Sequence, residues 1–163
     1  MKLALSLSVV LFTPLVSTTT FAVTDTVSIY VNGTLTKPPC TLTSSKTLSA
    51  NFGSLPYNQI DTAPLIDIPV TMSCPSNSSL NISIRAASAV SGSTTLASAG
   101  KTNLAYSLLW NSDNTAANIT GVKRSLTNQS GAVDLSLKAR LVTLGPLTEG
   151  AFSTTAVISI EYL

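Results

Sequence analysis

The chain has 163 residues, of which 44% are hydrophobic and only 10% are charged. This length fits one domain that buries a single core. The formal net charge is +2 and no run of basic residues occurs, which argues against nucleic acid as a partner. No histidine is present, so the commonest general base and the commonest metal ligand are both missing. We therefore expect no catalytic residues, no metal site and no cofactor.

The first 22 residues have the pattern of an export signal. Lys2 supplies a positive start, and residues 3–16 are apolar apart from small hydroxyl residues and Pro14. Thr20-Phe21-Ala22 then places small residues at both positions that signal peptidase recognises. The apolar stretch is shorter than the ~20 residues that a membrane-spanning helix needs. We expect residues 1–22 to be removed and the product to be exported. The alternative is a buried N-terminal strand or helix.

The sequence has two cysteines, Cys40 and Cys74. Neither lies in a CxxC pair or beside histidine, which excludes a zinc site and a thioredoxin-like redox pair. Two lone cysteines in an oxidising compartment are expected to pair, and closing a loop of about 35 residues stabilises a fold by roughly 3–4 kcal/mol. We predict one structural disulfide, and the alternative is two separate buried thiols.

Apolar and polar residues alternate along most of the remaining sequence, a pattern typical of strands with one face in a core. The alternating runs lie at residues 27–35, 66–74, 80–86, 133–141 and 152–162. A denser apolar run at 104–110 predicts a strand covered on both faces. Turn-rich segments separate the runs at 75–77, 91–93 and 111–114. The pattern predicts an all-β chain, most consistent with an immunoglobulin-like sandwich.

The two ends of this predicted sandwich are unusual. The run 27–35 precedes Pro38-Pro39, which cannot donate to a strand ladder and separates this run from the next segment. It is either an ordinary edge strand or an arm that pairs elsewhere. The run 152–162 carries only Glu161 as a charge, and no later strand is predicted to cover its edge. A spare strand and an open edge in one molecule point to strand exchange between molecules.

The sequence resembles the pilin subunits of chaperone–usher fimbriae of Gram-negative bacteria over its whole length. The matching features are Asn32-Gly33-Thr34-Leu35, Pro39-Cys40, Asn51-Phe52-Gly53, residues 68–74, residues 137–140 and the tail 150–163. The tail is the most specific of them. Family members carry a penultimate aromatic residue, here Tyr162, and a glycine as the fourteenth residue from the end, here Gly150.

The resemblance implies an incomplete immunoglobulin-like sandwich that lacks its seventh strand and has a hydrophobic groove beside the C-terminal strand. It implies a donor-strand extension at residues 23–36 and a pilin domain at 37–163. In the family, a periplasmic chaperone fills the groove first and the arm of the next subunit fills it permanently. The implied arm residues are Val27, Ile29, Val31, Gly33 and Leu35, with Gly33 at a narrow part of the groove. The implied chaperone-pairing and groove-edge residues are Gly150, Phe152, Ala156, Ile158, Ile160 and Tyr162.

From this resemblance we expect a non-enzymatic structural subunit of a surface fimbria that supports cell adhesion and resides outside the cell. The implied partners are the periplasmic chaperone, an outer-membrane usher and neighbouring subunits, which can include a tip adhesin. The single domain excludes a two-domain adhesin, and the compact length favours a minor tip adaptor over a shaft subunit. The alternative function is a free-standing secreted sandwich that binds a ligand such as a carbohydrate. Trp110 lies in an apolar run and is expected in the core rather than in such a site.

Overall fold

The computed structural model describes residues 24–163. Thr36–Leu163 form one compact unit, and the residues that precede them belong to a second. The expected export signal lies outside the described residues. Within residues 24–163, no helix is long and apolar enough to cross a membrane.

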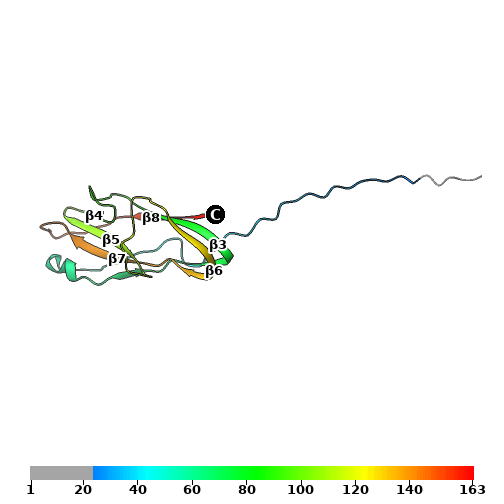
Figure 1. The fold of residues 1–163 in the computed structure, drawn as a ribbon. Coiled ribbons are helices and arrows are strands. Elements are labelled where there is room, and N and C mark those ends of the chain that lie inside the picture. The colour runs from blue at the N-terminus through cyan, green and yellow to red at the C-terminus, as the bar shows by residue number, and fades with distance from the viewer. Residues whose placement is uncertain (1–23) are drawn as a thin grey trace, which may run out of the picture. The chain divides into compact units, whose positions relative to one another are not determined.

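The regular secondary structure of the compact unit is almost entirely strand, so the prediction of an all-β fold is confirmed. Its elements in sequence order are β1 (Thr41–Leu42), the 3-10 helix η1 (Tyr57–Thr62), β2 (Ile66–Ile68), β3 (Thr71–Ala86), β4 (Ala97–Lys101), β5 (Leu104–Trp110), β6 (Arg124–Asp134), β7 (Leu137–Thr143) and β8 (Ala156–Tyr162). One sheet has the order β2-β7-β5-β4, and the other contains β1, β3, β6 and β8. Every pairing is antiparallel. Figure 1 shows β8 reaching the C-terminus alongside β3.

The alternation predicts one strand over residues 66–74, whereas the structure divides this segment between the two sheets. β2 pairs with β7 in one sheet, and β3 begins in the other. The break falls at Pro69, which has no N–H to donate to a ladder. A period-two pattern continues through such a crossing because both halves still direct alternate side chains into the same core.

The predicted strand at 133–141 divides in the same way, into the end of β6 and most of β7. Hydrogen bonds join this crossing to the first one. The N–H of Leu135 donates to the carbonyl of Val70 at 2.8 Å, and the N–H of Val70 donates to the hydroxyl of Ser136 at 3.1 Å. The two crossings therefore satisfy each other's backbone groups where each segment leaves its sheet.

β3 is the longest strand and determines the order of its sheet. Residues 80–82 pair with both β6 and β8, so these two strands lie on opposite sides of β3. Met72 pairs with both β1 and β6, so β1 lies on the same side of β3 as β8. The turn predicted at 75–77 is wrong: β3 continues there through a register irregularity between Cys74 and Ser78, within which Asn77 has φ of 60°.

The core lies between the sheets and contains the alternating residues that the sequence predicts. Leu80, Ile82 and Ile84 are almost fully buried, and every residue of β5 is buried, including Trp110. Cys40 and Cys74 form the predicted disulfide beside the β1–β3 pairing. Sequence reasoning missed β4 and most of β6. β6 is largely polar and exposed, and its conformation comes from pairing with β3 rather than from burial.

Candidate functional site

The C-terminal strand β8 has one strand neighbour among the described residues. It pairs with residues 80–86 of β3, and its opposite edge meets no strand between residues 24 and 163. Ile158 and Ile160 are half-buried against the core, Val157 is 62% exposed, and Tyr162 is 44% exposed. The sequence predicts a strand from Phe152, whereas pairing starts at Ala156. β8 therefore has an apolar face that the core covers only in part.

The half-buried hydrophobic residues at the rim of the core come mainly from two segments. They are Leu42, Leu48, Ala50, Phe52 and Leu55 after the disulfide, and Leu147, Phe152, Ile158 and Ile160 near the C-terminus. The two segments meet at Phe52 and Phe152, whose ring centroids lie 6.4 Å apart. Each Å² of apolar surface left in water forgoes about 25 cal/mol of burial free energy. An added apolar strand along this rim would recover part of that free energy.

A cavity of about 610 Å³ lies where these two segments meet, and we call it the head cavity. Residues 50–57 form one side and residues 147–152 the other, with Ile60 and Leu104 contributing from the core. Lys101 and Glu149 supply charged groups among its lining residues. The volume lies within the range of protein pockets that hold small organic groups.

The segment 144–155, which forms one side of the head cavity and leads into β8, is fixed to the β4–β5 hairpin. The ammonium of Lys101 donates to the carbonyl of Glu149 at 2.9 Å. The side-chain amide of Asn103 donates to the carbonyl of Pro146 at 2.8 Å. These bonds hold this side of the cavity to a strand pair that the core already anchors.

Two glycines allow the close approach of this segment. Gly100 has φ of 82°, and a Cβ there would lie 2.2 Å from the carbonyl oxygen of Ser153. Gly150 has φ of 131°, which L residues rarely adopt, and a Cβ there would lie 3.0 Å from the ammonium of Lys101. The glycine of the tail signature thus has a structural reason. Gly100 has the same kind of reason, yet no sequence signal singled it out.

The predicted arm is extended and exposed, and residues 24–39 belong to no strand. The exposed fractions of its large aliphatic anchors are 86% for Val27, 83% for Ile29, 91% for Val31 and 102% for Leu35. Around Gly33, a Cβ would meet no atom within 4 Å. This segment therefore presents a row of largely exposed aliphatic side chains to solvent.

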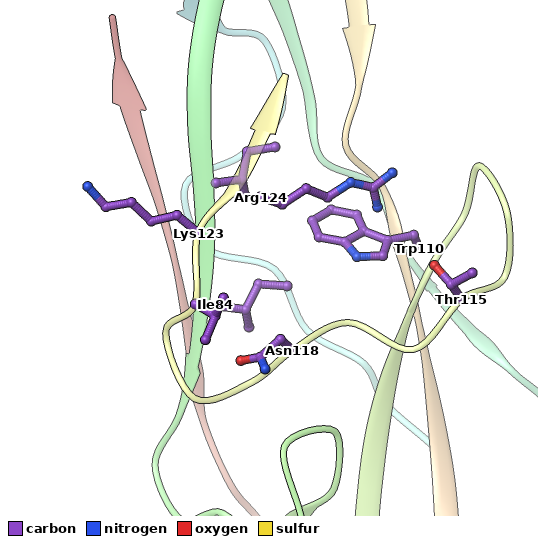
Figure 2. Close-up of a pocket in the computed structure, with 8 residues that line it drawn as sticks. Ile84, Trp110, Thr115, Asn118, Lys123 and Arg124 are labelled. Atoms are coloured by element: carbon purple, nitrogen blue, oxygen red, sulfur yellow. The ribbon is translucent and has the colours of Figure 1, made fainter. Parts of the chain in front are cut away.

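A second, smaller cavity of about 270 Å³ lies beside Trp110 (Figure 2). The guanidinium of Arg124 lies over the indole ring, 4.6 Å from its centroid. Lys123 extends away from the indole in Figure 2 and forms an ion pair with Glu161 on β8. Arg124 covers the aromatic ring and Lys123 has a partner elsewhere, so the polar groups do not converge on one ligand position. The head cavity and the edge of β8 are the better candidate site.

The chain belongs to the fimbrial protein family, whose sequence profile matches residues 29–163. It is therefore a structural subunit of a pilus, and the predicted resemblance is confirmed. The comparison with curated protein sequences found no match.

Solved pilus structures share the fold. The P pilus rod subunit PapA is 20% identical, with a TM-score of 0.63, covering 77% of this chain and 100% of that chain. A subunit in the structure of a chaperone–usher pilus, solved to explain rod uncoiling, is 18% identical, with a TM-score of 0.62 and coverage of 85% and 96%. The P pilus adaptor subunit PapF is 22% identical, with a TM-score of 0.56 and coverage of 78% and 98%. Rod and adaptor subunits both match, so the adaptor assignment stays a prediction.

The structure brings some of the predicted site residues together. Gly150 and Phe152 line the head cavity, Ile158 and Ile160 continue along the half-buried rim, and Tyr162 closes β8. Ala156 is exposed at the start of that strand. Sequence reasoning did not assign the opposite side of the cavity, formed by Leu55 to Tyr57, or the supporting residues Gly100 and Lys101. For the opposite side, the nearby motif Asn51-Phe52-Gly53 was the available signal.

Proposed function

We propose that the subunit polymerises by donor-strand exchange: the arm of one copy or of another subunit inserts beside β8 and completes the sandwich. The unpaired edge of β8 is the observation that carries this proposal. An inserted strand would satisfy backbone groups along that edge while its alternate side chains cover the half-buried rim. Burying four aliphatic anchors at roughly 1.5–3 kcal/mol each supplies about 6–12 kcal/mol before entropy costs.

The dimensions of the arm support the proposal. Residues 27–35 are nine residues and extend over about 30 Å at about 3.3 Å per residue, close to the length of the segment 152–162. All strands of the acceptor sheet pair antiparallel, and antiparallel pairing is the more stable arrangement. An antiparallel arm would place Leu35 at the head cavity and Val27 beside Tyr162. Gly33 would then lie near the start of β8, at Ala156.

The same edge would be occupied before assembly by a strand of a periplasmic chaperone, and an outer-membrane usher would then pass the subunit to the fibre. We place the mature protein at the cell surface, in a fimbria that supports adhesion. Residues 1–22 would serve as the export signal, 23–36 as the donor arm and 37–163 as the pilin domain. A tip adhesin is a candidate neighbour, because we propose the subunit as a tip adaptor.

The test is addition of a synthetic peptide of residues 27–35 to the mature protein. We expect the protein alone to be unstable or to aggregate, and the peptide to keep it soluble and raise its melting temperature. The matched control peptide replaces Gly33 with leucine, which keeps the alternation but is too large for the narrow part of the groove that the family resemblance implies at this position. It should fail to bind.

A mature protein that is a stable monomer, and whose melting temperature neither peptide changes, would overturn the proposal. Equal binding of both peptides would show that Gly33 does not face a narrow part of the groove. Fluorescence of Trp110, which lies in the core, provides a second measure of folding in the same samples.

A further inference from the structure

The arm contains a chemically reactive dipeptide. The sequence has ten asparagines, and Asn32 alone is followed by glycine. Asn32 and Gly33 are both exposed, and neither lies in a strand. A Cβ on Gly33 would meet no atom within 4 Å, so nothing crowds its backbone nitrogen. This nitrogen is the atom that can attack the neighbouring side-chain amide.

The reaction requires no enzyme and no oxidant. The backbone nitrogen of Gly33 loses its proton and bonds to the side-chain amide carbon of Asn32. The bond between that carbon and the amide nitrogen breaks, and this nitrogen takes up a proton and leaves as ammonia. The product is a five-membered succinimide ring. Water then opens the ring at one of its two carbonyls, giving aspartate or isoaspartate. Base accelerates the first step because the attacking nitrogen must be deprotonated, and glycine favours it because glycine has no side chain beside that nitrogen.

Three asparagines of the folded body, Asn51, Asn103 and Asn118, lack this freedom. The side-chain oxygen of Asn51 accepts from the N–H of Gly53 at 2.8 Å. Asn103 donates to the carbonyl of Pro146, and the side-chain oxygen of Asn118 accepts from Thr120 at 2.9 Å. A hydrogen-bonded amide in a fixed backbone cannot rotate to meet the nitrogen of the next residue.

We infer that Asn32-Gly33 is a spontaneous deamidation site that progressively inactivates the donor arms of unassembled subunits. Isoaspartate adds one carbon to the backbone between residues 32 and 33. Side chains before and after it would then fall out of step, so that Val31 and Leu35 could not seat together. Either product also adds a carboxylate next to Gly33, and a charge is costly to bring against an apolar groove. This consequence for assembly rests on the proposed function, whereas the chemical reaction does not.

A seated arm would be protected. Pairing with the edge of β8 would hold residues 27–35 extended and fix their backbone, which prevents the close approach that ring closure needs. Deamidation would therefore accumulate with time in unassembled subunits. An arm that is inserted early would keep its asparagine, and an arm that stays free would lose it.

The first experiment incubates the mature full-length protein at neutral and at alkaline pH and measures each asparagine by peptide mass spectrometry. We expect Asn32 to deamidate several-fold faster than the exposed Asn77, faster again at alkaline pH, and with isoaspartate as a product. Asn32→Gln removes the five-membered ring geometry and should abolish the modification, and Gly33→Ala should slow it several-fold. A rate at Asn32 no greater than at Asn77 would overturn the inference.

The second experiment compares two synthetic peptides of residues 27–35, one with asparagine and one with isoaspartate at position 32. We expect the asparagine peptide to stabilise the mature protein. The isoaspartate peptide should give little or none of that stabilisation. Equal stabilisation by both would overturn the inactivating role while leaving the deamidation reaction itself intact. If neither peptide binds, donor-strand exchange fails and the inactivating role fails with it, and the mass-spectrometric result still decides the chemical site.

Discussion

At the scale of single residues, Gly100 controls how closely the segment entering β8 approaches the β4–β5 hairpin. We predict that Gly100→Ala destabilises the fold for two reasons: its φ of 82° strains an L residue by about 1–2 kcal/mol, and the methyl group would overlap the carbonyl of Ser153. The overlap should add about 1–3 kcal/mol. Gly92→Ala is the matched control, because Gly92 has φ of 75° but open space around it.

Denaturant unfolding of the two variants separates strain from overlap. The unfolding experiment uses whichever sample is folded, either the protein alone or its complex with the arm peptide. The free energy of unfolding should fall more for Gly100→Ala than for Gly92→Ala. Equal losses would mean that the segment moves away from Gly100 at no cost.

Asp134, at the second sheet crossing, makes a pH-dependent contribution to the stability of the fold. Its carboxylate accepts from the hydroxyl and from the N–H of Ser136, the latter at 2.9 Å, and these bonds lower the pKa of Asp134 below its ordinary value. A lowered folded-state pKa gives stability that is present above the unfolded value of about 3.9 and is lost as the pH falls through the folded pKa. Because Asp134 is exposed, this contribution should be under about 1 kcal/mol.

We predict that Asp134→Asn reduces stability at neutral pH and that the difference from the native protein vanishes below the folded pKa. Asparagine keeps an acceptor for Ser136 but has no charge to lose. The measurement is unfolding free energy against pH from 7 to about 2. The Thr115 hydrogen bonds lower the pKa of Asp113 in the same direction, so Asp113→Asn is a useful comparison away from the crossing. A native-minus-variant difference that is constant with pH would contradict the argument.

At the scale of elements, the two faces of β8 should behave differently towards a donor strand. Ile160 is half-buried on the rim that an inserted arm would cover, and Val157 is exposed on the other face. We predict that Ile160→Ala weakens binding of the arm peptide by about 1–2 kcal/mol, roughly tenfold in Kd, and that Val157→Ala leaves it unchanged. Titration followed by Trp110 fluorescence measures both. Equal losses would mean that the arm does not cover the inner face.

The elements also show which structural features alternation can predict. Alternation identified residues 80–86 correctly, and a dense apolar run identified β5, because burial on one or both faces determines residue type directly. It could not locate the sheet crossings at Pro69 and Leu135, since the side-chain pattern continues through them. It also missed the polar half of β6, which is fixed by pairing with β3. Alternation could not predict the head cavity either, because loops form this cavity and they meet only through tertiary contacts.

At the scale of the whole molecule, the proposed donor segment and the proposed acceptor edge belong to the same chain, and polymerisation by strand exchange would require both. Fusing a second copy of residues 27–35 after Leu163 through a short turn should fill the acceptor edge of the same molecule. An antiparallel arm makes this possible, because its start would lie beside the end of β8, where the N–H of Leu163 donates to the carbonyl of Ser79. The fused protein should therefore be a folded monomer that keeps its own N-terminal arm free.

We predict that this fusion raises the melting temperature by about 10–20 °C, since several kcal/mol of anchor burial remain after entropy costs. A fused copy carrying leucine in place of its glycine should give little of that increase. The fused protein donates but does not accept, so mixing it with the native protein should shorten polymers in proportion to its share, as measured by light scattering. Polymers that keep their length, or a fused protein that extends them like the native one, would show that the edge of β8 is not the acceptor.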